Sequence, residues 1–199
     1  MAGAAPLVCL ASTSPRRREL LAQIGVPHLV RAADIDEAVH AGERPEDYVV
    51  RMACAKARTV QARGTPLPVL AADTTVVVAG LICGKPLDRA DAVSMLGRLA
   101  GRTHQVLTAV ALASAAGIDF RLSASDVRLR SMSAQECAAY WETGEPHDKA
   151  GGYAIQGRGA LFVEHLSGSY SGVMGLPLFE TGELLAAAGV PVLPVGMPA

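Results

Sequence analysis

Apolar and polar positions along the chain predict strands and helices in turn. Residues 6–11 form a short apolar run typical of a buried strand, and residues 15–24 follow as a helix that a glycine ends. A second short strand is expected over residues 28–32, and a proline opens a long helix over residues 45–62. This alternation of strands and helices predicts an α/β fold.

The strongest strand signal is LPVLAADTTVVVAG, residues 67–80, after which a turn and a short second strand are expected. An amphipathic helix is predicted over residues 88–99, because its apolar side chains share one side. Two longer strands, around residues 103–115 and 118–130, are separated only by a short turn. That spacing predicts an antiparallel hairpin.

The last third of the chain has weaker periodicity. Ser133 and Glu136 form a capping box that starts a helix ending near Thr143. Residues 144–159 are rich in glycine and polar side chains and show no clear pattern of secondary structure. Another strand is expected over residues 162–166.

The chain closes with a predicted helix over residues 177–188 and a proline-rich tail, residues 189–199, that we expect to fray. Half of the 199 residues are hydrophobic, so a sizeable core can be buried. We interpret residues 1–199 as a single domain whose core spans residues 6–188.

Composition excludes some classes of protein. The net charge of −1 argues against a nucleic-acid partner, since no broad basic surface is available. The four cysteines are scattered and form no Cys-x-x-Cys pair, which favours structural thiols in a reducing compartment. The N-terminal charges follow the apolar run, unlike those of a signal peptide, and no apolar run reaches membrane-spanning length. We expect a soluble cytoplasmic protein with no membrane partner.

The stretch LVCLASTSPRRREL, residues 7–20, carries the clearest chemical signal. Three arginines follow Pro15 in the first turn of the predicted helix, although a helix N-terminus carries partial positive charge and prefers acidic side chains. Free backbone N–H groups, two serine hydroxyls and guanidinium groups together favour a phosphate site. The alternative is a solvated basic turn that follows a strand.

Two charged residues fall at positions predicted to be buried. Asp73 interrupts the strongest strand, and a buried carboxylate is costly unless it is paired, binds a metal or is catalytic. It could also bond nearby backbone N–H groups or face solvent. Lys56 shares a helix face with the apolar Val49 and Met52. Its amine either extends to the edge of the core or points into a polar cleft.

Other candidates lie in turns and loops. Lys85 lies between a glycine and a proline in a tight turn, where many lysines are simply exposed. The polar, glycine-rich segment 143–159 has the length of loops that are often functional in compact domains. In this segment Gln156 offers a donor and an acceptor to the edge of a base, whereas Asp148 and Lys149 could pair with each other.

Taken in order along residues 6–188, these segments resemble the Maf family of nucleotide pyrophosphatases. The resemblance is carried by the pair Asp36-Glu37 and by seven further blocks: LASTSPRRREL, RMACAKA, AADTTV, GKPLD, AGRTHQVLTAVAL, TGEPHDKAGGYAIQGRGA and GSYSGVMGLPL. Eight blocks in register are far more specific than one. The resemblance implies a fold akin to the inosine triphosphatase superfamily: a mixed, elongated central sheet flanked by helices, with two lobes around a cleft.

The resemblance also implies a reaction. Members of the family hydrolyse a nucleoside triphosphate to the monophosphate and pyrophosphate with a divalent metal, Mg²⁺ or Mn²⁺, and often form homodimers. Asp73-Thr74, Lys149 and Gln156 are similar to the branch that acts on dTTP and UTP, with modified pyrimidine nucleotides as further candidates. Two alternatives stay open: a pyrophosphatase for 7-methyl-GTP or another purine triphosphate, and a nucleotide-binding regulator of cell division without turnover.

Carried over by matching motif, five residues are expected at the phosphate end of the substrate. Ser12, Arg16 and Arg17 would bind phosphate oxygens, assisted by N–H groups of the helix N-terminus. Lys56 and Lys85 would hold the rest of the polyphosphate and stabilise the leaving pyrophosphate.

The remaining roles concern the metal, the proton and the base. Glu37, with Asp73, would hold the metal, and Asp73 would act as the general base toward water attacking the α-phosphorus. Gln156 would recognise the pyrimidine edge, and Lys149 would also contact the substrate. We expect cytosine to be rejected, because its amino group reverses the order of donor and acceptor at that edge.

Overall fold

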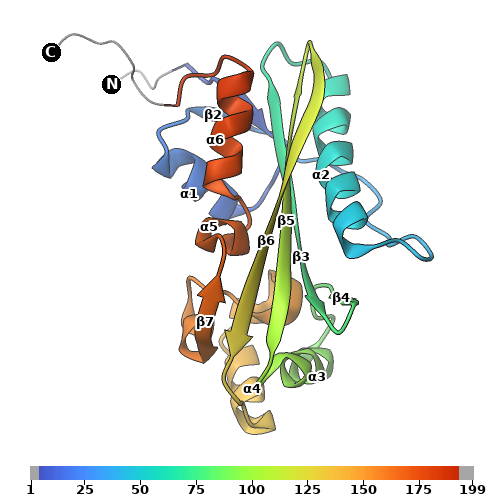
Figure 1. The fold of residues 1–199 in the computed structure, drawn as a ribbon, viewed down its shortest axis with the longest axis vertical. Coiled ribbons are helices and arrows are strands. Elements are labelled where there is room, and N and C mark those ends of the chain that lie inside the picture. The colour runs from blue at the N-terminus through green and yellow to red at the C-terminus, as the bar shows by residue number, and fades with distance from the viewer. Residues whose placement is uncertain (1–4, 193–199) are drawn as a thin grey trace, which may run out of the picture.

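The computed structural model describes residues 5–192, which form a mixed seven-stranded sheet with helices on both faces (Figure 1). The strands are β1 (Val8–Leu10), β2 (His28–Val30), β3 (Val69–Val78), β4 (Leu81–Cys83), β5 (Thr103–Ser114), β6 (Gly117–Leu129) and β7 (Val163–Ser167). Their order is β2-β1-β3-β5-β6-β7, with β4 also paired to β3. β1 runs parallel to β2 and β3, and the other pairs are antiparallel. The predicted α/β class and mixed sheet are confirmed.

Six α-helices and three short 3₁₀ helices surround the sheet in the described residues. The α-helices are α1 (Pro15–Gln23), α2 (Pro45–Ala62), α3 (Arg89–Leu99), α4 (Ala134–Trp141), α5 (Tyr170–Met174) and α6 (Leu178–Ala187). The 3₁₀ helices are η1 (Glu145–Asp148), η2 (Ala150–Gly152) and η3 (Arg158–Phe162). Figure 1 shows α1, α2 and α6 around one end of the long strands and α3 and α4 at the other.

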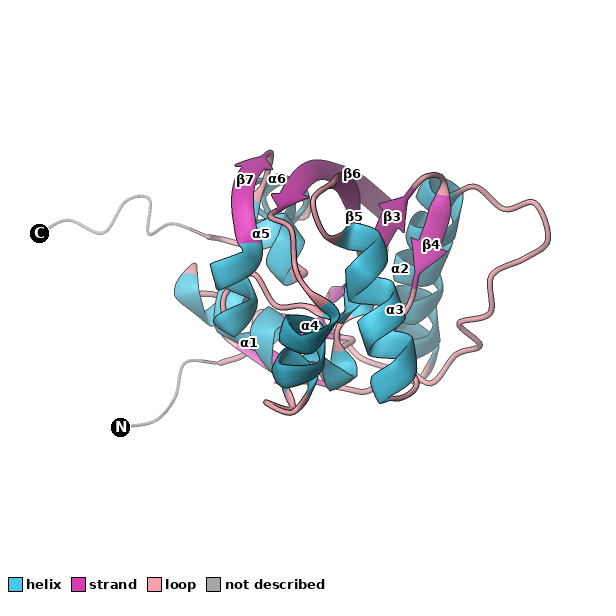
Figure 2. Cartoon of the chain, turned by 90° about the horizontal axis from the view of Figure 1, so that it is seen from below, coloured by secondary structure: helices cyan, strands magenta, loops and turns pink. Residues whose placement is uncertain are grey.

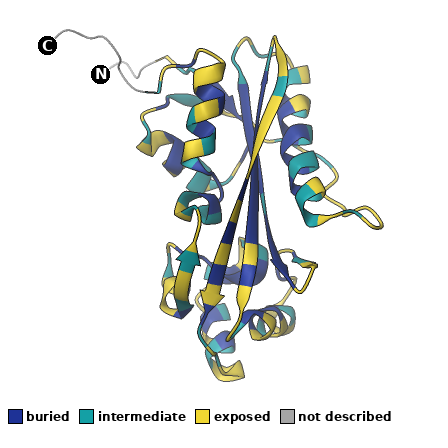
Figure 3. Ribbon diagram, in the orientation of Figure 1, coloured by how far each residue is buried: buried dark blue, intermediate teal, exposed yellow. Residues whose placement is uncertain are grey.

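At the α2 end, helices cover both faces of the sheet, so alternate side chains of a strand enter different clusters. Ala71 and Ala109 pack in the cluster beneath α2, whereas Leu70 and Leu112 pack in the cluster beneath α1 and α6. β3 is accordingly buried along almost its whole length, while β6 alternates between exposed and buried positions toward its end (Figure 3). A continuous apolar run is what a strand with both faces covered requires.

At the other end a third cluster joins the sheet to α3 and α4. Seen from this end, the strands follow an arc with α3 and α4 on its inner side (Figure 2). Val76 and Val127 of the sheet pack there with Leu96 of α3 and Tyr140 of α4. Tyr153, which follows η2, belongs to the same cluster. The glycine-rich segment is therefore anchored in the core by a buried side chain.

Most predicted elements are confirmed, several to within one or two residues. α2 has the predicted bounds, β5 and β6 form the predicted hairpin, and the Ser133–Glu136 capping box is present. The prediction for 144–159 was incomplete, because this segment contains the turns of η1 and η2 and the start of η3. α5 was not predicted, since its five residues are too few for a helical period to show. Of the predicted frayed tail, 193–199 lie outside the described residues.

Among residues 5–192, no helix combines the length and the apolar character needed to cross a membrane.

One histidine is buried in the core. His104 of β5 is 3% exposed, and its Nε2 lies 2.8 Å from the hydroxyl oxygen of Tyr153. Its Nδ1 has no hydrogen-bond partner within the described residues. Burial disfavours the charged imidazolium and lowers the pKa of His104 from 6.5 to about 4.

This burial makes stability depend on pH. The folded-state pKa lies below the unfolded one, so the unfolded chain takes up the proton first, and stability is lost as the pH falls from 6.5 toward 4. We expect the free energy of unfolding to fall by about 2 kcal/mol between pH 7 and pH 5 on this account. Urea denaturation at the two pH values measures this loss. Because most carboxylates titrate below about pH 5, they contribute little to the difference.

His104→Gln should remove most of this loss, whereas the matched change His165→Gln, at an exposed position of β7, should keep it. An equal loss in wild type and His104→Gln would contradict the assignment.

Candidate functional site

A pocket of about 470 Å³ opens beside the middle of β3. Its walls come from the loop between β1 and α1, from α1, α2 and β3, from the turn after β4, from 148–156 and from α5. All nine residues singled out in the sequence line it: Ser12, Arg16, Arg17, Glu37, Lys56, Asp73, Lys85, Lys149 and Gln156. Ser12 and Gln156 lie 144 positions apart in the chain, so distant segments meet at one site.

The pocket exists here because β1 is short. β1 pairs with β3 only as far as Leu70, and the last backbone bond between the two runs from Ala11 N to Leu70 O. Between this bond and the pairing with β4, which begins at Val76, the edge of β3 faces the pocket instead of a neighbouring strand. Asp73 and Thr74 lie on this stretch, and as neighbours in a strand they point to opposite faces of the sheet. The pocket thus lies beyond the carboxyl end of β1, where ligand sites of α/β sheets are generally found.

On the α2 side of β3, Lys56 joins two carboxylates. Its Nζ lies 2.6 Å from Asp73 Oδ1 and 2.6 Å from Glu37 Oε1. Lys56 and Asp73 are 9% and 8% exposed, so the lysine does not extend to the edge of the core but points into a polar cleft. Asp73 is the paired buried carboxylate that the sequence allowed, not one that faces solvent.

The buried charges of the cleft shift the pKa values of Glu37 and Tyr48. Burial acts to raise the pKa of Glu37, but the hydrogen bond from Lys56 and the charges of Lys85 and Arg17 outweigh it, so the pKa lies below its usual value. Burial, with Asp73 and Glu37 nearby, raises the pKa of Tyr48 to about 12. The Tyr48 hydroxyl donates to the backbone oxygen of Glu37 at 3.1 Å and stays protonated at neutral pH.

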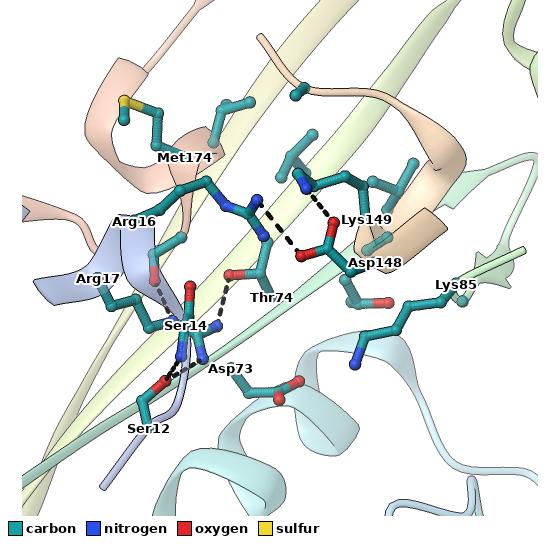
Figure 4. Close-up of a pocket in the computed structure, with 18 of the residues that line it drawn as sticks. Ser12, Ser14, Arg16, Arg17, Asp73, Thr74, Lys85, Asp148, Lys149 and Met174 are labelled. Atoms are coloured by element: carbon teal, nitrogen blue, oxygen red, sulfur yellow. Dashed lines mark hydrogen bonds and ion pairs between the residues drawn. The ribbon is translucent and has the colours of Figure 1, made fainter. Parts of the chain in front are cut away.

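On the other side of β3, Arg17 ties three segments together (Figure 4). Its Nε donates to Gly175 O at 2.7 Å, Nη1 to Ser12 Oγ at 3.4 Å and Nη2 to Thr74 Oγ1 at 3.3 Å. Burial lowers the pKa of Arg17, and the charge of Asp73 opposes this shift. Three of its five N–H donors are used in these contacts, and two are left for a ligand.

The opening turn of α1 carries the groups that the sequence assigned to a phosphate site. Ser14 is the N-cap residue, and in the described structure its side chain forms no capping hydrogen bond. Its backbone N–H donates instead to Ser12 Oγ at 3.2 Å. Arg16 and Arg17 both line the pocket, while Arg18 is exposed and lies outside it.

The wall opposite Arg17 comes from the glycine-rich segment. Arg16 Nη1 lies 3.8 Å from Asp148 Oδ2, and Asp148 also pairs with Lys149, as its position beside that lysine allowed (Figure 4). Lys85 extends into the pocket from the turn after β4, and Gln156 is an exposed residue of the lining.

The charged lining consists of five basic and three acidic side chains, which suits a polyanion.

Two carboxylates, Glu37 and Asp73, share Lys56 and are the oxygen donors that fit a hard divalent cation. Across residues 5–192 no group of three or more His, Cys, Asp or Glu side chains is placed to hold a metal. A cation at this pair would need further oxygen ligands, and Mg²⁺ commonly takes these from substrate phosphates and water.

Sequence reasoning missed Tyr48 and Gly175. Tyr48 precedes Lys56 by two steps of four residues, so the helical period placed both on one face, and this signal could have found it. The role of Gly175 rests on its backbone oxygen, which accepts from Arg17 across 158 positions of the chain. No local sequence pattern reports such a contact.

Curated relatives are similar over nearly the full length. A protein of Methylobacillus flagellatus is 52% identical over 187 residues, covering 93% of this chain and 94% of its own. One from Burkholderia pseudomallei is 54% identical over 198 residues, covering 93% and 95%. Both are named dTTP/UTP pyrophosphatase. Among solved structures, the Staphylococcus aureus Ham1 protein aligns with a TM-score of 0.42 and 15% identity, covering 61% of this chain and 71% of its own.

The sequence model of the family described as Maf-like protein matches residues 7–188. This range contains all nine predicted residues of the pocket, and it agrees with the relatives that are more than half identical over most of their length. The chain belongs to the Maf family.

Proposed function

We propose that this protein hydrolyses dTTP and UTP to the nucleoside monophosphate and pyrophosphate. The observation that carries the proposal is the Lys56–Glu37–Asp73 cluster facing a wall of further basic side chains in one pocket. The names of the relatives support the same reaction and the same pair of substrates.

The phosphates would lie between α1 and Lys85. A triphosphate carries about four negative charges, and enzymes that cleave it act mainly by positioning and charge neutralisation. Arg16, the free donors of Arg17 and the N–H groups that open α1 supply positive potential on one side. Lys85 and Lys56 supply it on the other and would stabilise the pyrophosphate as it leaves.

Glu37 and Asp73 would hold a divalent cation, Mg²⁺ or Mn²⁺, which when bound offsets phosphate charge and makes water more acidic. Lys56 bonds both carboxylates and keeps them close together before substrate arrives. The pKa of Glu37 is already below its usual value, so this donor is anionic at neutral pH.

Asp73 would act as the general base. One of its oxygens, Oδ1, accepts from Lys56, and the other would accept a proton from the water that attacks the α-phosphorus. The bond between the α-phosphorus and the bridging oxygen then breaks, and that oxygen leaves with the pyrophosphate. The buried strand fixes the carboxylate, so little reorganisation is needed during the reaction.

Gln156 would recognise the base. Its amide offers one donor and one acceptor, which match the acceptor and donor at the edge of uracil or thymine. Cytosine presents the reverse order. Purines would be excluded by the size of the space beside Gln156.

We also propose a homodimer, as the family resemblance implies, and a cytoplasmic location, which the scattered cysteines favour. Modified pyrimidine nucleotides are candidate substrates too. The alternatives are a purine or 7-methyl-GTP pyrophosphatase and a nucleotide-binding regulator without turnover; the first experiment below distinguishes them.

A panel of nucleoside triphosphates tests the reaction directly through pyrophosphate release. With Mg²⁺ or Mn²⁺ we expect turnover of dTTP and UTP and little from CTP, ATP or GTP. EDTA should abolish it, because without the cation the two carboxylates would repel the phosphates and nothing between them would offset the negative charge. Preference for a purine would favour the first alternative, and binding without turnover of any nucleotide would favour the regulator.

Asp73→Asn should lower kcat by at least about a hundredfold, since an amide accepts a proton poorly and general bases contribute roughly 10²–10⁴. Nucleotide binding should survive, because the side chain keeps its size. Pyrophosphate release and calorimetric binding of UMP measure the two effects. Asp119→Asn, at an exposed position of β6, serves as the control and should behave as wild type. Substantial activity of Asp73→Asn would remove Asp73 from the role of base.

Gln156→Ala should change base preference more than rate. Each hydrogen bond lost contributes about 0.5–1.5 kcal/mol, so the ratio of kcat/KM for UTP over CTP should fall about tenfold or more. Gln105→Ala, on an exposed position of β5 outside this pocket, is the matched control. An unchanged ratio would place base recognition on other residues.

A further inference from the structure

The segment that carries Gln156 is held by two side chains that lie behind it. Before Gln156, the backbone N–H of Ala154 donates to the Tyr140 hydroxyl at 3.1 Å. That hydroxyl in turn donates to Oε1 of Glu145, the first residue of η1. Tyr140 thus connects the backbone on one side of Gln156 to the carboxylate of Glu145.

After Gln156, the same carboxylate holds the chain again. Glu145 Oε2 accepts from the backbone N–H of Arg158 at 2.9 Å, and Oε1 accepts from the N–H of Gly159 at 3.0 Å. One carboxylate and one phenol therefore fix the backbone both two residues before and two to three residues after Gln156. We call Tyr140 and Glu145 the loop clamp.

The packing around the loop clamp leaves no room for side chains. A Cβ placed on Gly157 would lie 2.2 Å from Glu145 Oε2, and one on Gly159 would lie 2.6 Å from Ala154 O. Glycine allows the backbone to approach the Glu145 carboxylate closely at position 157, and the Tyr140 hydroxyl and the backbone of Ala154 at position 159. The backbone of this segment therefore depends on glycine to keep its hydrogen bonds to Glu145.

The clamp is itself fixed in the core. Tyr140 is 3% exposed, and its ring packs edge-on against Phe162 with centroids 5.1 Å apart. Burial acts to raise the pKa of Glu145, but the hydrogen bonds from Tyr140, Gly159 and Arg158 outweigh it and lower that pKa below its usual value. The carboxylate is therefore ionised at neutral pH, as an acceptor of three hydrogen bonds should be.

We propose that Tyr140 and Glu145 are positioning residues for base selection, which hold the Gln156 side chain in the orientation that distinguishes uracil and thymine from cytosine. Neither residue is in the lining of the pocket, so both act through the backbone that carries Gln156. The inference rests on the proposed function, in which Gln156 recognises the base.

The geometry predicts a selective effect. The groups assigned to the phosphates and the proton lie on α1, α2 and β3 and on the turn after β4, whereas the clamp holds only 154–159. Two hydrogen bonds to a base edge require the amide to be fixed within about 0.5 Å and 10–20°. Loosening the clamp should therefore weaken recognition of the base and leave the phosphate site intact.

Tyr140→Phe and Glu145→Gln test this with little change of shape. Phenylalanine keeps the ring and its packing on Phe162 but loses the hydroxyl. Glutamine replaces one carboxylate oxygen with a donor that cannot accept from the backbone. Glu142→Gln is the matched control: it makes the same charge change nearby, at an exposed residue paired with Arg89 on the surface.

Three quantities should be measured for the full-length protein: kcat/KM for UTP and CTP, the affinity for UMP and the affinity for inorganic tripolyphosphate. In both clamp variants we expect the UTP-to-CTP ratio to fall about tenfold, since misplacement by 1 Å can cost as much as a hundredfold. UMP should bind more weakly, while tripolyphosphate affinity should change less than about twofold, because it reports the phosphate site alone. Glu142→Gln should match wild type.

A purely structural role gives a different result. The variants would then lose activity equally toward all nucleotides, with tripolyphosphate affinity falling in step and the UTP-to-CTP ratio unchanged, and the inference would be overturned. If wild type fails to hydrolyse UTP and dTTP, the proposed function falls and this inference with it. If wild type is selective and the clamp variants are equally selective, the inference alone falls.

Discussion

The site depends on one buried charge, the ammonium of Lys56. It lies between two carboxylates, one fixed in the sheet and one on the loop before α2, at 2.6 Å from each. Removing one partner of a buried ion pair commonly costs about 3–5 kcal/mol, because the remaining charge is left without compensation. Without Lys56, Glu37 and Asp73 would repel each other across the same space. The lysine therefore makes it possible to have two carboxylates close together beside a site that must also bind phosphates.

The shortness of β1 gives this charge cluster its access to a ligand. A longer β1 would pair with β3 past Leu70 and cover its edge. Because it stops, adjacent residues of β3 reach the pocket from opposite faces of the sheet: Asp73 meets Lys56 from α2, and Thr74 meets Arg17 from α1. The helices on the two faces thus contribute different chemistry to one pocket without any change in the direction of β3.

Much of this could be predicted from the sequence because the informative residues break local rules. Asp73 interrupts an apolar strand, Lys56 lies on an apolar helix face, and Arg16 and Arg17 open a helix where acidic side chains are preferred. Each exception is costly unless a partner or ligand compensates it, so each indicates a site. Apolar patterning also located the long helix, whose bounds the structure confirms, and the hairpin, whose strands agree with the prediction to within one residue.

The missed features have no such local signal. α5 is only five residues long, and the backbone of 154–159 is held by contacts to Tyr140 and Glu145 instead of by a repeating pattern. The backbone oxygen of Gly175 can be assigned to Arg17 only when the two ends of the chain are placed side by side. Resemblance to the Maf family marked these segments as important, but only the structure shows which atoms they use.

The groups around the pocket are held in two ways, and the division follows the chemistry. The groups proposed for phosphate and proton transfer sit mainly on elements held by the main core clusters, where strands and helices fix them by packing. Gln156 lies in a segment of short turns, where a glycine-rich backbone needs separate restraint. A carboxylate that accepts three hydrogen bonds supplies it with very few side chains. Because this restraint lies outside the phosphate site, base preference could change through the residues around Glu145 while Asp73, Lys56 and Arg17 keep their positions.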